Sequence, residues 1–130
     1  MMRSATTIIA LSLCLTAFAH HSVAVFDGRR VVKIEGTVTE FRWINPHAYI
    51  EIEGIGAGES AAGHWSVEMQ APNSMSGEGW KRDTLTAGSK VTVYANPLRS
   101  PDAAGRRRAL YAGIILPDGR TLGRIEADNR

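Results

Sequence analysis

The chain has 130 residues, with 15 Lys and Arg against 13 Asp and Glu, so its formal net charge is +2. Hydrophobic residues make up 44% of it, which is typical of one small folded domain and excludes a disordered chain. The length excludes a TIM barrel or a two-domain, Rossmann-sized enzyme. The small basic excess argues against a dedicated nucleic-acid binder, which must contact many phosphates.

Residues 1–19 have the pattern of a secretory signal peptide. Arg3 is their only charge, an apolar run extends from Ile8 to Leu15, and Ala17-Phe18-Ala19 offers the small-x-small site that signal peptidase accepts. The apolar run is well short of the roughly 20 residues of a membrane-spanning helix, which argues against an anchor. We therefore expect cleavage after Ala19 and a periplasmic or secreted protein.

The sequence offers two alternatives to this cleavage. A lipoprotein attached through Cys14 would place the bulky Leu13 where a small residue should precede the cysteine. Cleavage after Ala17 would put His20 at the third position, although Leu15 suits that site poorly. The one cysteine of the chain, Cys14, would be removed with the signal peptide. The expected mature domain, residues 20–130, can therefore use neither disulfides nor thiolate ligands.

Alternation of apolar and polar residues predicts strands through the first half of this domain. The first covers residues 32–43 and changes phase between Val38 and Phe41, which predicts a bulge or sharp coil. Asn45-Pro46 breaks it, since proline cannot donate a ladder hydrogen bond. Strands at 47–53 and 64–70 follow, joined by a flexible segment at 54–63. We expect the apolar residues of these two strands to face the interior: Ala48, Ile50, Ile52, Trp65, Val67 and Met69.

The second half alternates loops with two more strands. Residues 72–80 allow one or two helical turns, kept short by their glycines. Loops at 83–89 and 96–105 enclose a strand at 90–94. A last strand at 107–116 carries Leu110, Ala112 and Ile114, and a turn at 117–120 precedes a frayed end at 126–130.

This order predicts an all-β domain: a small OB-like five-stranded barrel with a short helical insertion between strands 3 and 4. The alternative, a β-sandwich, needs about seven strands, for which the domain has little room.

Several short motifs occur together along the expected mature chain: His20-His21-Ser22 with Phe26, Trp43-Ile44-Asn45-Pro46-His47, Pro72-Asn73, Gly79-Trp80-Lys81-Arg82-Asp83-Thr84-Leu85, Gly88-Ser89-Lys90-Val91-Thr92-Val93 and Leu116-Pro117-Asp118-Gly119. In this combination the chain resembles a family of small exported bacterial proteins of unknown function. The likeness covers nearly all of the expected mature chain, and it implies export and a small barrel without supplying an activity.

A histidine at the new N-terminus predicts a metal site. The α-amine and the imidazole of His20 can chelate one ion, and His47 can complete a nitrogen set suited to copper or zinc, with His21 as an optional ligand or orienter. Glu68 is the best carboxylate candidate, as a ligand or an orienter, although a solvated strand face is the favoured interpretation of this residue. The alternative to a metal site is that His20 and His21 bind nothing, because polar residues commonly follow a cleavage site.

His64 is excluded from that site. If the second and third strands pair around residues 54–63, His64 lies opposite Glu53 and His47 opposite Gln70. These two pairs are then roughly 20 Å apart along the strands, too far to share one ion.

A second hypothesis is a metal-free OB-like adaptor for a protein, a peptide or an anionic glycan. Its ligand-binding residues would be Trp80, Arg82, Arg106, Arg107 and Arg108. Against it, the tryptophans are most simply packing residues, and three adjacent arginines on a strand alternate faces, so we expect a solvated rim.

Catalysis is not expected. The sequence has no nucleophile elbow, phosphate-binding loop or metalloprotease helix motif. Glu51 and Glu53 are expected on one exposed strand face, about 7 Å apart along the strand. The sequence thus favours an exported binding module, with no nucleic-acid partner and no membrane span in the mature chain.

Overall fold

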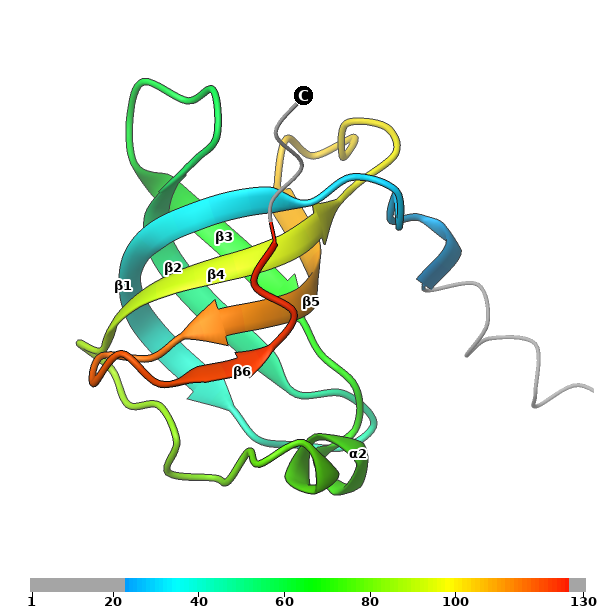
Figure 1. Ribbon diagram of the computed structural model, residues 1–130. Coiled ribbons are helices and arrows are strands. Elements are labelled where there is room, and N and C mark those ends of the chain that lie inside the picture. Colours follow the sequence, from blue (N-terminus) through cyan, green and yellow to red (C-terminus); the bar gives the residue numbers. More distant parts are fainter. Residues whose placement is uncertain (1–22, 127–130) are drawn as a thin grey trace, which may run out of the picture.

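The computed structural model describes residues 23–126, which form a β-barrel with a short helix between two of its strands (Figure 1). No helix among the residues described is long and apolar enough to cross a membrane. The expected signal peptide, His20 and His21 lie outside these residues. The elements in chain order are β1 (Val32–Arg42), β2 (Tyr49–Gly56), β3 (Gly63–Glu68), α2 (Pro72–Gly77), β4 (Lys90–Pro97), β5 (Arg107–Ile115) and β6 (Thr121–Gly123).

Five of the strands close into a barrel, as the sequence predicts. The hydrogen-bonded order is β3-β2-β1-β4-β5-β6, and a further pairing of β3 with β5 closes the ring. That closing pair is parallel, whereas the other neighbours are antiparallel. The helix α2 lies between β3 and β4 at one end of the barrel (Figure 1). The OB-like architecture with a helical insertion is therefore confirmed.

The first strand bends around the barrel, and its phase change is confirmed. The pairing of β1 with β2 shifts register between Val38 and Glu40, which is the irregularity that the alternation predicts. Gly36 allows the close approach of these two strands. A Cβ atom at this position would lie 2.4 Å from the carbonyl oxygen of Glu53, so only glycine fits without a shift of backbone.

The barrel interior is filled by the inward residues of all five strands. The six inward residues predicted for β2 and β3 are all buried, as are Val91 and Val93 of β4. The expectation for the last strand is only partly right. Ile114 is buried, but Ala109 is buried in place of Leu110 and Ala112. The reason is a register shift between Tyr94 and Ala95 in the β4–β5 pair, which changes the phase of β5.

Two further segments complete the fold. β6 was not predicted by the alternation, since it is only three residues long, and it pairs with the second half of β5. The segment before β1 is attached to the end of β4: Phe26 forms a bridge with Leu98, and the amide of Asp27 donates to the carbonyl of Pro97 at 2.8 Å. Part of the N-terminal lead is therefore fixed beside the loop that joins β4 to β5.

Candidate functional site

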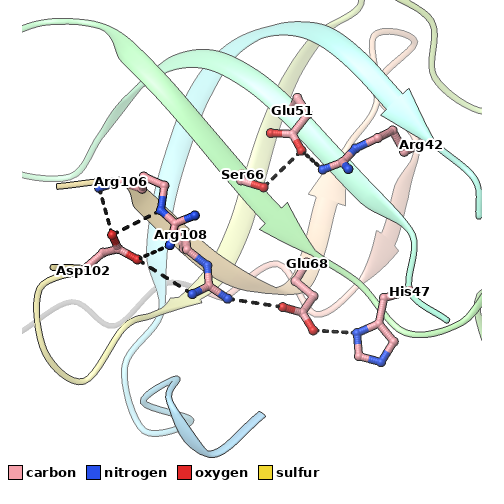
Figure 2. Close-up of polar contacts among 8 residues, drawn as sticks. All are labelled: Arg42, His47, Glu51, Ser66, Glu68, Asp102, Arg106 and Arg108. Carbon is pink, nitrogen blue, oxygen red and sulfur yellow. Dashed lines mark hydrogen bonds and ion pairs between the residues drawn. The ribbon is translucent and has the colours of Figure 1, made fainter. Parts of the chain in front are cut away.

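Polar side chains gather on the outer face of β2, β3 and the start of β5. Figure 2 shows two groups there, one around Glu51 and one around Glu68. Their positions follow from the strand pairing, which sets Tyr49 opposite Glu68 and Ser66 beside Arg108. Because alternate residues of a strand share a face, the outward residues of the three strands meet in one strip.

The His47–Glu68 pair lies at one end of this strip. His47 follows the Asn45-Pro46 break, and its Nδ1 atom lies 2.5 Å from Oε1 of Glu68. The Glu68 residue is only 4% exposed, so the interpretation of this residue as a solvated strand face is wrong. It is covered because Arg108 of the neighbouring strand reaches over the end of β3, 3.7 Å from the second carboxylate oxygen.

The arrangement of this pair determines which imidazole nitrogen is free. An ionised carboxylate can only accept hydrogen bonds. Nδ1 of His47 is therefore the donor to Glu68, and Nε2 keeps its lone pair when the ring is neutral. The side chain of His47 is 27% exposed, so the ring is accessible from outside.

The contacts continue from Glu68 into the loop before β5. The Arg108 guanidinium lies 3.8 Å from Asp102, and Asp102 accepts two hydrogen bonds from the Arg106 side chain, at 3.2 and 3.1 Å. Backbone amides of Ala104 and Arg106 also donate to it. These contacts, the Arg106 side chain first, lower the pKa of Asp102 from 3.8 to about 2. The loop is thus linked through Arg108 to the His47–Glu68 pair (Figure 2).

Glu51 forms the second group and is also buried, contrary to the expected exposed face. Its carboxylate accepts hydrogen bonds from Arg42 and from the Ser66 hydroxyl, and Nε2 of His64 lies 2.9 Å away. These partners compensate the buried charge. Tyr49 lies between the two groups, under the Arg42 guanidinium, and burial together with the nearby Glu68 raises its pKa.

His64 lies where the sequence places it. It is opposite Glu53 in the β2–β3 ladder, and its side chain is 59% exposed at the rim. The two imidazoles contact different carboxylates: His64 contacts Glu51, and His47 contacts Glu68.

The described residues supply only part of the predicted metal site. Within residues 23–126, no three His, Cys, Asp or Glu side chains are grouped so that they could hold an ion. Of the predicted histidine ligands, the structure describes His47, and the carboxylate candidate Glu68 is in contact with it. The other predicted ligands, His20 and His21, lie outside the described residues.

The residues of the second hypothesis are separated by the fold. Trp80 is 1% exposed, packs against Phe41 and Tyr111, and donates from Nε1 to the Tyr111 hydroxyl at 3.2 Å. Its ring therefore has no free face for stacking on a ligand, and the packing interpretation holds. Arg82 is exposed in the loop after α2.

The three arginines, by contrast, share one cleft. A cleft of about 450 Å³ is lined by His64, Ser66, Gly105, Arg106, Arg107 and Arg108. The three arginines border this cleft, but their carboxylate neighbours differ: Asp102 for Arg106, Glu59 for Arg107 and Glu68 for Arg108. β5 begins only at Arg107, so Arg106 belongs to the loop and does not follow strand alternation.

Comparison with known proteins gives a family and no activity. Residues 8–107 match the model of a family described as a family of unknown function (DUF6152). No curated protein and no solved structure matches the chain.

Proposed function

The chain belongs to this family of unknown function, DUF6152, and we propose that it is an exported module that binds copper or zinc. His47 supplies one imidazole, and the mature N-terminus supplies the amine and ring of His20. His21 is a further ligand or orients the others. The proposal is one of binding and not of catalysis.

The observation that carries the proposal is the His47–Glu68 contact. Imidazoles that bind metals commonly donate their other ring N–H to a carboxylate, which fixes the tautomer and makes the ligand nitrogen more basic. Here the Nδ1-to-Oε1 distance of 2.5 Å and the burial of Glu68 supply that arrangement before any metal is present. Nε2 of His47 is left as the coordinating atom.

The path of the N-terminal lead supports a contribution from His20. Val23 and Gln70 line the same small cavity, and the Gln70 carbonyl accepts the amide of Ala48, the residue after His47. The described chain therefore starts on the side of the barrel that carries His47. His20 precedes Val23 by three residues, which span at most about 11 Å when extended.

The chemistry of the donors suits a late first-row divalent ion. An α-amine and an imidazole of the same residue chelate without distortion of the fold, and both lose their protons near neutral pH. Nitrogen ligands favour Cu(II) most strongly and also suit Zn(II). Three protein nitrogens would leave a coordination position for water or another ligand.

Titration of the mature protein with Cu(II), and separately with Zn(II), tests this function. We expect one saturable site at neutral pH that His47→Ala weakens by tenfold or more, since a ligand is lost. One extra residue before His20 should weaken it similarly, because the chelating amine is displaced. His64→Ala is the matched control and should leave the affinity unchanged. An unchanged affinity in His47→Ala would contradict the proposal.

A further inference from the structure

We propose that the cleft beside β3 binds the oxyanion group, carboxylate or phosphate, of a small ligand, with Arg108 as the principal contact. This proposal does not depend on the proposed metal site, although Arg108 lies 3.7 Å from Glu68, the partner of His47. It retains the arginines of the adaptor hypothesis and replaces Trp80 and Arg82 with Ser66 and His64.

The lining of the cleft has the chemistry of an anion site. Three of its six lining residues are arginines, and His64, Ser66 and Gly105 complete it, with no carboxylate among the six. Its volume of about 450 Å³ lies in the range of small-molecule sites, roughly 300–1,000 Å³. Guanidinium groups bind carboxylates and phosphates through two parallel hydrogen bonds, which favours this class of ligand.

Arg108 is held in place while its donors are left available. Its nitrogens lie 3.7 Å from Glu68 and 3.8 Å from Asp102, distances that are longer than hydrogen bonds. Its guanidinium also lies 5.7 Å from the centre of the Phe26 ring. With a side chain that is one-third exposed, this arginine can donate to a ligand without first breaking a hydrogen bond to either carboxylate (Figure 2).

The surrounding carboxylates are already matched by other partners. Asp102 accepts from Arg106 and from two backbone amides, and Glu59 is paired with Arg107 at 2.8 Å. Glu68 is shared with His47. The Arg108 guanidinium can therefore bind an anion, because Glu68 and Asp102 beside it already accept hydrogen bonds from other donors.

The test uses the purified mature protein, residues 20–130, and two probes, inorganic phosphate and citrate, followed by amide NMR shifts. We expect saturable shifts at Ser66, Gly105 and Arg108 with at least one probe. The preferred probe distinguishes a phosphorylated ligand from a carboxylate. Arg108→Gln should weaken binding by roughly tenfold, as expected for the loss of a charge-assisted hydrogen bond. Arg82→Gln, outside the cleft, is the control and should bind as the wild type does.

Two further variants separate electrostatics from damage to the fold. Arg108→Lys keeps the charge without the forked geometry and should retain part of the affinity. Glu68→Gln removes a negative charge 3.7 Å from Arg108, so it should strengthen anion binding, whereas general loss of structure would weaken it. The inference is overturned if neither probe gives saturable shifts in the wild type, or if Arg108→Gln keeps them. Metal titration of the same wild-type sample reports on the proposed function independently.

Discussion

The imidazole of His47 and the carboxylate of Glu68 are in contact although 21 residues separate them in the chain. The β2–β3 ladder produces this contact. It pairs Tyr49 with Glu68, so His47, two residues before Tyr49, lies close to the end of β3. The amide of Met69 donates to the carbonyl of Ala48, which extends the pairing past the end of β3. Barrel closure by β5 then brings Arg108 onto the same carboxylate.

Replacement of Glu68 should destabilise the fold. Glu68→Gln weakens the contacts to His47 and Arg108 in a buried position, and we expect the free energy of unfolding to fall by about 1–3 kcal/mol. Glu53→Gln changes an exposed carboxylate of the same face and should alter it by less than about 0.5 kcal/mol. Urea denaturation of both variants measures the difference. Equal stabilities would show that the buried contacts contribute nothing.

A methyl group at Gly36 should disturb the pairing of β1 with β2. In Gly36→Ala the new Cβ atom would meet the backbone of Glu53 and Gly54 at 2.4 and 2.6 Å, so the strands must separate. We expect a loss of stability of about 1–3 kcal/mol or more. Gly77→Ala, where nothing lies within 4 Å, should be tolerated. Thermal unfolding followed by circular dichroism compares the two, and a tolerated Gly36→Ala would argue against the tight β1–β2 crossing.

Asp102 should titrate far below an ordinary aspartate. Its hydrogen bonds from Arg106 and the loop amides lower its pKa from 3.8 to about 2. Because the folded pKa is the lower one, Asp102 stabilises the fold above pH 3.8 and loses this contribution as the pH falls through about 2. Carboxyl-carbon NMR should show this midpoint, and Arg106→Gln should move it toward 3.8. A midpoint that this variant leaves unchanged would contradict the assigned cause.

Tyr111 should ionise only at high pH. Burial raises its pKa from 10.0 to about 12, with a smaller contribution from Glu78, while the hydrogen bond from Trp80 opposes the shift. The neutral phenol therefore stabilises the fold below pH 10, and this contribution is lost as the pH rises through about 12. Tyrosinate absorbance should show this late component in the wild type, and Tyr111→Phe should remove it. Its persistence in the variant would assign it to another tyrosine.

Much of the architecture could be predicted from local patterns. Period-two alternation identified five strands, and the change of phase between Val38 and Phe41 indicated the irregularity that the structure places between Val38 and Glu40. The ladder position of His64 opposite Glu53 also followed from the pattern once the intervening loop was recognised. These predictions succeed because side-chain direction in a strand depends only on position along the chain.

The burial of the outward residues could not be predicted in the same way. Glu51 and Glu68 occupy outward positions, and alternation alone predicts that side chains at such positions are exposed to solvent. They are buried because Arg42 and Arg108, from other strands, lie over them. The phase of β5 was missed for a related reason, since its register shift occurs in the pairing with β4 and leaves no local pattern.

The sequence by itself determined the order of the elements along the chain, the inward faces of β2 and β3 and the candidate ligand His47, because each depends on neighbours along the chain. Only the tertiary structure decided that Glu68 contacts His47, that Trp80 is buried and that the three arginines line one cleft. Those facts depend on which strands become neighbours when the barrel closes. Closure brings together segments that are distant in the chain. Only then can their side chains form ion pairs and exclude water.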